Sequence, residues 1–224
     1  MKAMDVMVRD VVTVKPNDDV AHAVELLVKH DISALPVVDD QGAVVGVLSE
    51  ADLIHRAELG TEKSRPWWLE AITPAASLAA DFAKSHGRRV EEIMSTRPVT
   101  AAEDAALAEI AALLERHRIK RVPIVRDGRL VGIVSRSNLI QALASSQAAP
   151  QQTTEVDRQI RQELLTRLAE QPWSGFDARN VIVQGGTVHL WGLVGSEAER
   201  KALLALAEEV PGVARVSDEM IPAY

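Results

Sequence analysis

Two parts of the chain show the same succession of hydrophobic patterns. In each part, apolar residues first recur with the three-to-four-residue spacing of an amphipathic helix. Two short apolar runs follow, at 35–38 and 44–48 in the first part and at 122–125 and 130–134 in the second. Because a tight-turn signal separates the runs, we predict a helix followed by a β-hairpin in both parts. The helical positions are Val20, Ala23, Val24 and Leu27, and then Leu107, Ile110, Ala111 and Leu114.

The amino acids themselves repeat together with the pattern. A second helix is expected after Ser49 in the first copy and after Ser135 in the second. Each copy is too small to bury its apolar face alone, so we expect the two copies to pack against each other. The matching segments are DVM (5–7) and EIM (92–94), HDISALPVV (30–38) and HRIKRVPIV (117–125), and GVLSEADLI (46–54) and GIVSRSNLI (132–140).

Two further segments separate the repeated parts from each other and from the rest. The segment between the copies contains Trp67, Trp68 and Phe82, so we predict an ordered insertion with helical portions. The later segment ASSQAAPQQTT (144–154) is small, polar and uncharged, which is typical of a flexible linker. The predicted organisation is a first motif at 1–58, the insertion at 59–90, a second motif at 91–145, the linker at 146–153 and a C-terminal domain at 154–224.

A different pattern begins near residue 154. A helical apolar stripe precedes two β-type runs at 181–183 and 188–194, which the turn QGGT joins. An amphipathic helix at 198–209, a Pro-Gly break and a last strand at 213–216 follow. The fold class predicted for the whole chain is α+β, with helices layered on sheets: a repeated pair and a small αββαβ domain. The stripe consists of Val156, Ile160, Leu164, Leu165 and Leu168.

Composition narrows the class of protein. Apolar residues make up 47% of the chain and charged residues 25%, which is typical of a globular protein. The net charge of −7 argues against binding nucleic acid or an anionic membrane through a basic field. The chain has no cysteine, which excludes disulfides, thiol nucleophiles and cysteine-based metal sites and fits a reducing compartment.

Charged residues also interrupt the apolar start of the chain. Asp5, Arg9 and Asp10 lie within the first twelve residues, which therefore lack the uninterrupted apolar run of a signal peptide. No charge-free apolar run in the sequence reaches the length that spans a membrane. We therefore expect a soluble protein of the cytoplasm.

The repeated segments resemble the cystathionine-β-synthase (CBS) domain, present as a tandem pair over roughly 1–145. The motifs LPVV, GVLSEADL and GIVSRSNL carry this resemblance. The C-terminal part resembles the BON domain over roughly 154–220, through GTVHLWGLV (186–194), ER (199–200) and VPGVARV (210–216).

The CBS resemblance implies a pseudo-two-fold pair with two clefts between its sheets. Such clefts commonly hold AMP, ADP, ATP, S-adenosylmethionine or a related nucleotide, with NADH a further candidate. The resemblance also implies regulation rather than catalysis, and a homodimer formed through the CBS pairs. The BON resemblance implies an interaction or phospholipid-associated module.

Ser49 and Asp52 follow a predicted strand and open a helix. A serine with an acidic residue three positions later is a capping box, so the two residues have a purely structural interpretation. In a CBS pair, the Asp52 carboxylate is also suited to accept hydrogen bonds from both ribose hydroxyls. The second copy has Ser135 and Asn138 at these positions, and the asparagine accepts without charge assistance. We predict that both pairs contact the adenosine, and that the cleft of the second copy binds it more weakly or prefers another ligand.

Lys120 and Arg121 directly precede a strand of the second copy, where the first copy has Ser33 and Ala34. The CBS resemblance assigns such basic residues to phosphate binding, and the planar guanidinium suits that role. The alternative is a solvated helix end, which we expect for the neighbouring Arg116 and Arg118. The predicted lining of the adenine slot is Ala34, Leu35, Gly46, Val122 and Gly132, of which Leu35 and Val122 also fit a plain core.

Residues for catalysis do not assemble into any recognisable motif. The six histidines lack a metal-ligand spacing such as HExxH, so no metal site is predicted. Gly185 and Gly186 form a hairpin turn rather than a phosphate loop, since no GK[ST] follows. We therefore predict no catalytic residue and no enzymatic activity.

Two functions fit these observations. In the first, a sensor binds an adenosine compound and relays its state through the BON domain to an unidentified protein partner. In the second, the CBS pair is a ligand-independent dimeric scaffold and the BON domain binds a protein or lipid. Residues 151–224 carry seven basic and eleven acidic side chains, which disfavours anionic lipid. Trp173 and Trp191 are candidates for the interaction surface, with a partly buried core position as the alternative.

Overall fold

The structure is a computed structural model that describes residues 1–55, 60–61, 73–145 and 153–223. It divides into two compact units, and the chain enters each of them more than once. The first-repeat unit consists of Asp10–Val99 and Val125–Leu130. The second-repeat unit consists of Met1–Arg9, Thr100–Ile124 and Val131–Tyr224, so it includes the C-terminal domain. Trp67, Trp68 and all but the last residue of the predicted linker lie outside the described residues.

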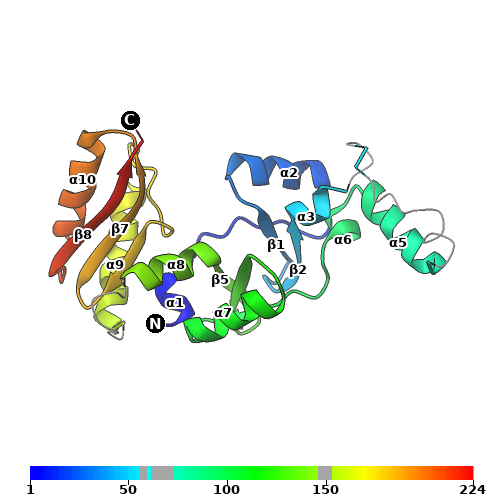
Figure 1. Cartoon of the computed structure of the whole chain (residues 1–224), viewed down its shortest axis with the longest axis horizontal. Helices are drawn as coiled ribbons and strands as arrows, with labels where there is room; N and C mark the ends of the chain where they lie inside the picture. Colours follow the sequence, from blue (N-terminus) through cyan, green and yellow to red (C-terminus); the bar gives the residue numbers. More distant parts are fainter. Residues whose placement is uncertain (56–59, 62–72, 146–152, 224) are drawn as a thin grey trace. The chain divides into compact units, whose positions relative to one another are not determined.

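The first-repeat unit contains the predicted helix and hairpin. Strands β1 and β2 pair antiparallel with Leu35 opposite Leu48, and Val14 adds a parallel bridge to Val37. Helix α2 buries Val20, Ala23 and Leu27, whereas Val24 remains 39% exposed. The elements are α2 (Val20–Lys29), β1 (Ala34–Val38), β2 (Val44–Ser49), α3 (Glu50–Leu53), α5 (Ala75–His86) and α6 (Val90–Ile93) (Figure 1).

The second copy forms the equivalent elements, as the repeat predicts. Its sheet has the order β3-β4-β5 and its core contains Ile110, Leu114, Val122 and Ile124. The hydrophobic pattern predicts the hairpin and both longer helices but misses the one-turn helix α1 and the two-residue strand β3. The elements are α1 (Ala3–Val6), β3 (Ala101–Ala102), α7 (Leu107–Arg116), β4 (Arg121–Arg126), β5 (Arg129–Ser135) and α8 (Arg136–Ser145).

The segment that begins each copy forms backbone hydrogen bonds with the hairpin of the other copy. Val8 pairs with Ile133 of β5, and Ser95 pairs with Val47 of β2. At both pairings, the segment that begins one copy crosses over a glycine in the hairpin of the other copy, where a larger residue would not fit. A Cβ on Gly132 would lie 2.5 Å from Met7 Sδ, and a Cβ on Gly46 would lie 2.5 Å from Met94 Sδ. The segments 5–7 and 92–94 therefore repeat because each covers the glycine in a hairpin of the opposite copy.

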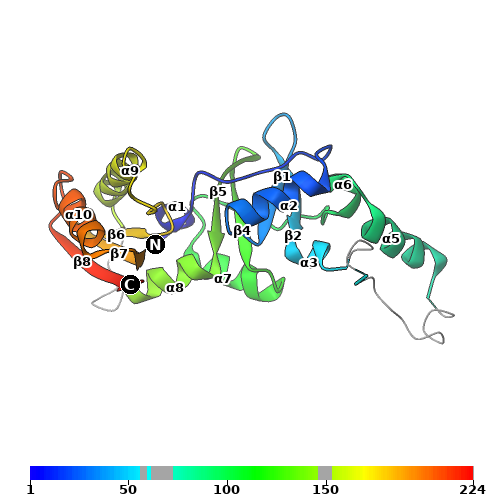
Figure 2. The ribbon, with the colours of Figure 1, turned by 90° about the horizontal axis from the view of Figure 1, so that it is seen from above.

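The C-terminal domain has the predicted αββαβ order. Its sheet has the order β6-β7-β8, with β6 antiparallel and β8 parallel to β7, and both helices lie on one face (Figure 2). Gly185 and Gly186 form the hairpin turn with φ of 57° and 71°, a backbone conformation that favours glycine. The elements are α9 (Glu155–Ala169), β6 (Val181–Gln184), β7 (Thr187–Val194), α10 (Glu197–Glu208) and β8 (Arg215–Pro222).

The last strand corrects the sequence interpretation. The hydrophobic pattern predicts a strand at 213–216, but β8 runs from Arg215 to Pro222 and pairs with the whole of β7. The acidic residues Asp218 and Glu219 hide this strand from the hydrophobic pattern. In the structure Asp218 forms an ion pair with Arg200 at 2.8 Å, and Glu219 Oε1 lies within hydrogen-bond distance of His189 Nδ1, at 2.9 Å.

Candidate functional site

The first capping box lies where β2 ends and α3 begins. The backbone N–H and the hydroxyl of Ser49 both donate to Oδ2 of Asp52, at 2.9 and 2.8 Å. No described residue donates to Oδ1 of Asp52, and this side chain is half-buried. The capping interpretation is confirmed, and it occupies only one of the two carboxylate oxygens.

The second capping box has the same geometry with a neutral side chain. The backbone N–H and the hydroxyl of Ser135 donate to the amide oxygen of Asn138, at 2.9 and 2.8 Å. Asn138 is only 4% exposed. The cap therefore tolerates the change from carboxylate to amide, while the charge and the accessibility that suit a ribose contact are both lower in the second copy.

Lys120 and Arg121 lie beside the second box. The first residue of α8, Arg136, donates its backbone N–H to the carbonyl of Lys120 at 3.1 Å, which brings the start of β4 next to the end of β5. The Lys120 side chain is exposed and that of Arg121 is half-buried. In the first copy, Glu50 N–H binds the Ser33 carbonyl at 3.1 Å, so the same position carries no cation there.

The residues predicted to line an adenine slot have structural roles of their own. Leu35 and Val122 are fully buried, which confirms their interpretation as core, and Ala34 is 7% exposed. Gly46 and Gly132 are covered by Met94 and Met7. The structure divides the predicted site residues between the units: Ala34, Leu35, Gly46, Ser49 and Asp52 in the first-repeat unit, and Lys120, Arg121, Val122, Gly132, Ser135 and Asn138 in the second.

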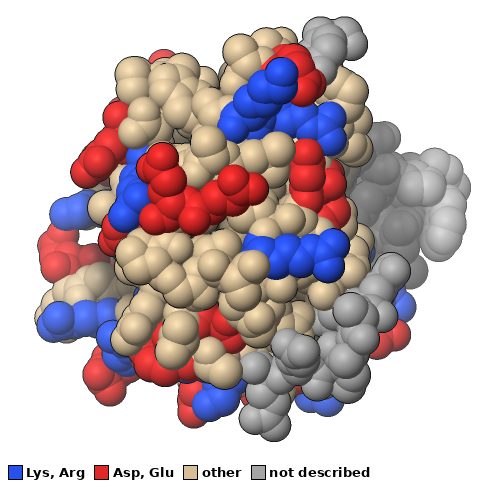
Figure 3. Space-filling model, turned by 90° about the vertical axis from the view of Figure 1, so that its left-hand side faces the viewer, with Lys and Arg blue, Asp and Glu red and all other residues tan. Residues whose placement is uncertain are grey.

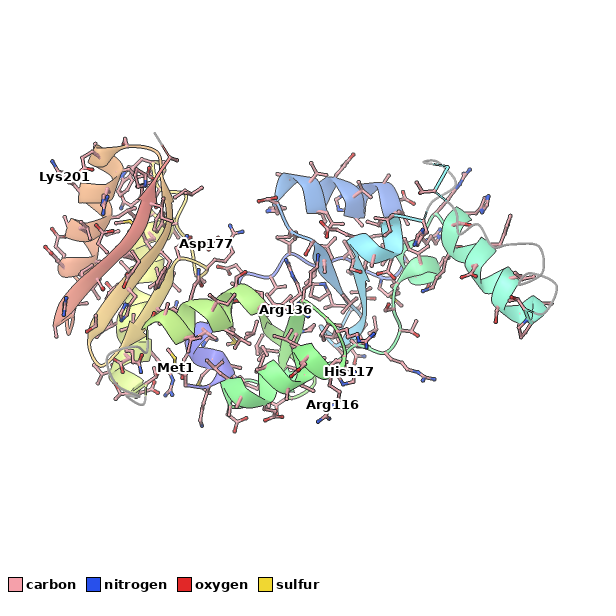
Figure 4. All side chains as sticks on the ribbon, in the orientation of Figure 1. Met1, Arg116, His117, Arg136, Asp177 and Lys201 are labelled. Atoms are coloured by element: carbon pink, nitrogen blue, oxygen red, sulfur yellow. The ribbon has the colours of Figure 1, made fainter. Side chains whose placement is uncertain are left out.

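The other basic residues near Lys120 are solvated. Arg116 ends α7, and Figure 4 shows it with His117 at that end of the helix; both are exposed. Arg118 is also exposed and has a φ of 54°, matching Asp31 at 50° in the first copy. This pair of positive φ angles shows that both copies leave their first long helix through the same turn.

A third capping box opens α9 in the C-terminal domain, and the sequence analysis did not identify it. The backbone N–H and the hydroxyl of Thr154 donate to Oδ2 of Asp157, at 2.7 and 2.8 Å. Gly186 N–H donates to Oδ1 at 2.7 Å. Burial opposes ionisation of Asp157, but these donors outweigh it and hold the pKa of the carboxyl below its usual range. The TxxD pattern at 154–157 was the available signal.

The same helix carries two arginines that contact the N-terminal segment. Arg158 Nε donates to Oδ1 of Asp5 at 2.7 Å. Arg161 donates to the carbonyls of Val181 and Ala178 at 2.9 and 2.8 Å, and to that of Met7 at 3.3 Å. Burial is the main cause that lowers the pKa of Arg161, to about 10, so it remains a cation at neutral pH. An acidic residue inside an apolar segment, Asp5, was the only sequence signal for this contact.

The outer face of the C-terminal sheet is partly apolar. Trp191 is half-buried there, and Trp173, in the segment before β6, is 44% exposed and donates to the Gln171 side chain at 3.1 Å. Leu193 and Ile221 are register partners on β7 and β8 and are 67% and 61% exposed. Figure 3 shows acidic and basic side chains interspersed on the side where α10 and β8 lie.

The described residues contain neither a cluster of metal-ligating side chains nor a membrane-spanning helix. No group of three or more His, Asp or Glu side chains in the described part of the chain is arranged to hold a metal ion. None of the described helices combines the length and the apolar character that crossing a bilayer requires.

Comparison with protein families identifies three domains. The CBS domain model matches residues 3–58 and 90–145, and the BON domain model matches 156–221.

Curated relatives of this chain include CBS-domain proteins and an enzyme. The CBS domain-containing protein YhcV of Bacillus subtilis is 31% identical over 155 residues, which cover 69% of this chain and 94% of YhcV. The chloroplastic protein CBSX2 of Arabidopsis thaliana is 31% identical over 135 residues, which cover 58% of this chain and 57% of CBSX2. An inosine-5′-monophosphate dehydrogenase of Methanocaldococcus jannaschii is 30% identical over 149 residues, but only 25% of its length is covered.

The solved structures that share this fold include that of a relative already named. The crystal structure of CBSX2 in complex with AMP matches with a TM-score of 0.57 and 30% identity, covering 65% of this chain and 98% of that one.

Proposed function

The chain belongs to the family of CBS-domain proteins, with a tandem CBS pair followed by a BON domain, and from this premise we propose that it is a regulatory protein that binds an adenosine compound. AMP, ADP and ATP are the leading ligands, with S-adenosylmethionine and NADH as further candidates. The observation that carries the proposal is the Asp52 carboxylate, whose Oδ1 accepts a hydrogen bond from none of the residues that the structure describes. The AMP complex of CBSX2, which shares the fold of the pair, supports the choice of ligand.

The two copies would contribute differently to binding. Asp52 offers a charged acceptor for a ribose diol, whereas Asn138 offers a neutral one that is almost fully buried. Lys120 and Arg121, next to the second box, offer cations for a phosphate, and the first copy has Ser33 and Ala34 instead. Phosphate recognition is therefore assigned to the second copy and the stronger ribose contact to the first.

Titration calorimetry and thermal shift with AMP, ADP, ATP, S-adenosylmethionine and NADH test the proposal. A ligand at a hundred times its Kd stabilises the folded protein by about 2.7 kcal/mol. If none of these compounds gives heat or a shift, the sensor function is wrong and the ligand-independent scaffold is favoured.

Adenosine tests the phosphate assignment. Lys120→Ala and Arg121→Ala should each weaken AMP binding by roughly three- to tenfold, since a charge-assisted contact is lost. The same variants should bind adenosine as the unmodified chain does. Equal losses for AMP and adenosine would contradict a phosphate contact. Arg116→Ala, a neighbouring exposed cation, is the matched control.

The remaining parts of the proposal concern assembly and chemistry. We expect a homodimer formed through the CBS pairs, a BON domain that relays the ligand state to a protein partner, and no catalysis. Light scattering with and without AMP measures the first. Prolonged incubation with ATP, followed by chromatography of the nucleotides, measures the last, and formation of ADP or AMP would contradict it.

The scaffold hypothesis keeps one supporting observation. Asn138 replaces the acid in the second box, and the first copy lacks the basic pair, so neither copy alone carries a complete set of ribose and phosphate contacts. In that hypothesis the exposed Leu193 and Ile221 of the BON sheet would bind the partner without any nucleotide.

A further inference from the structure

The two CBS copies present equivalent carboxylates at the start of α1 and α6. Glu92 in α6 is exposed, and its Oε2 accepts from the backbone N–H groups of Arg88 and Arg89 at 2.7 and 2.9 Å. Asp5 in α1 accepts in the same way from Lys2 N–H at 2.7 Å but is only 2% exposed. The two positions have the same local geometry, so the difference in burial comes from what covers Asp5.

The BON domain covers it. Arg158 of α9, 153 residues away in sequence, donates to the second oxygen of Asp5. One turn later, Arg161 reaches the Met7 carbonyl at 3.3 Å, while its other hydrogen bonds tie it to Val181 and Ala178 of its own domain. Arg161 is 5% exposed, so its charge is compensated by these carbonyls rather than by water.

Apolar packing joins the same two parts. Ile182 of β6 points away from the BON core and is 3% exposed. It belongs instead to the hydrophobic cluster of the second CBS copy, together with Ala3, Val6 and Met7. The contact therefore combines an ion pair, a buried guanidinium and a buried aliphatic side chain.

The contacted segment leads directly to the second capping box. Met7 covers Gly132 in β5, and Val8 exchanges two backbone hydrogen bonds with Ile133, at 3.0 and 2.9 Å. Ser135, two residues after Ile133, begins the box that Asn138 completes. An element that holds Met7 and Val8 in place thus also supports the end of β5.

We propose that α9 of the BON domain is a clamp on the N-terminal segment Met1–Arg9, and that through this segment it orders the Ser135–Asn138 box of the second CBS copy. The clamp couples the BON domain to the second copy. Only the interpretation of the box as a ligand contact rests on the proposed function.

Hydrogen exchange of the full chain without nucleotide tests the clamp. Arg158→Ala should raise the exchange rates of the Met7, Val8 and Ile133 amides at least about tenfold, and that of Asn138 by about threefold. The Val47 and Ser95 amides, which form the equivalent pair in the first copy, should not change. Arg167→Ala is the matched control, since Arg167 lies on the same helix and pairs only locally with Glu163 among the described residues.

A second variant separates the clamp from a general loss of structure. Asp5→Asn keeps an acceptor for Lys2 N–H but removes the charge that faces Arg158, so it should reproduce the pattern of Arg158→Ala. Glu92→Gln should leave Met7 and Val8 unchanged. Unchanged exchange at Met7 and Val8 in both clamp variants would overturn the proposal, as would an equal rise at Val47 and Ser95. A failure to bind AMP would contradict the proposed function alone, because this experiment uses no nucleotide.

Discussion

The capping box of the first CBS copy and that of the BON domain differ in whether the second oxygen of the aspartate, Oδ1, accepts a hydrogen bond. Both use Oδ2 of an aspartate to accept from the backbone and the hydroxyl of the residue three positions earlier. In the BON domain, Oδ1 of Asp157 accepts from Gly186 across the fold, and the side chain is 1% exposed. In the first copy, Oδ1 of Asp52 accepts from no described residue. The same four-residue motif is thus a tertiary anchor in one place and a candidate ligand contact in the other.

The largest expected difference between the two boxes is in stability. Asp157→Asn retains one acceptor oxygen but turns an amide N–H₂ toward a group that donates, so it should cost about 2–3 kcal/mol of unfolding free energy. Asp52→Asn should cost less than about 0.5 kcal/mol, since Asn138 forms the same cap with an amide. Urea unfolding followed by circular dichroism measures both. Equal losses would contradict the distinction between anchor and free cap.

The strands that lead to the two CBS boxes provide the next comparison. Gly46→Ala and Gly132→Ala should each destabilise the protein by about 1–3 kcal/mol, because the added methyl group meets a methionine sulfur and a backbone carbonyl. Gly175→Ala, where a Cβ meets nothing within 4 Å, should have no measurable cost. Thermal unfolding of the three variants is the measurement. A tolerant Gly132 with a sensitive Gly46 would show that the two crossings are not equivalent.

For ligand affinity we expect the reverse of the stability result: the substitution at Asp52 should have the larger effect and that at Asp157 the smaller. On the proposed function, Asp52→Asn should weaken AMP binding by about tenfold, which corresponds to about 1.4 kcal/mol for the lost charge assistance. The Asp157→Asn variant should bind AMP as tightly as the unmodified chain, provided that it is measured below its unfolding temperature. Calorimetry gives both values. Asp40→Asn, which removes an equal charge from an exposed side chain, is the control. Unchanged affinity in Asp52→Asn would mean that Asp52 is a helix cap and nothing more.

The smallest effect concerns acid. The pKa of Asp157 is lower in the folded state than in the unfolded chain. Its ionised carboxylate therefore stabilises the folded state at pH values above the pKa that this carboxyl has in the unfolded chain. This stabilisation is lost as the pH falls through the folded pKa, in the region below about pH 4. Comparing unfolding midpoints of Asp157→Asn and the unmodified chain between pH 3 and pH 6 should show a smaller acid-induced loss in the variant. A gap between the two that stays constant with pH would contradict the role of the charge.

The sequence by itself determined most of the architecture. The repeat, the hairpins and the αββαβ order follow from local periodicity and turn chemistry, which depend only on neighbouring residues. The capping boxes of the pair are also local, so they too could be identified. The extent of β8 could not be predicted, because Asp218 and Glu219 break its apolar pattern and only the folded sheet places Arg200 and His189 beside them.

Only the tertiary structure decided which contacts the capping residues and the N-terminal segment make. Asp5, Arg158 and Arg161 are of charged residue types that usually lie on the surface. Their burial depends on contacts between residues more than 150 positions apart in sequence. Gly46 and Gly132 look like strand glycines until Met94 and Met7 are placed above them. Sequence alone likewise does not distinguish Oδ1 of Asp52, which accepts from no residue in the described part of the chain, from Oδ1 of Asp157, which accepts from Gly186. The hydrogen bonds of a capping motif lie within one helical turn, so the local sequence predicts them. Which residue contacts the second carboxylate oxygen depends on how the whole unit packs.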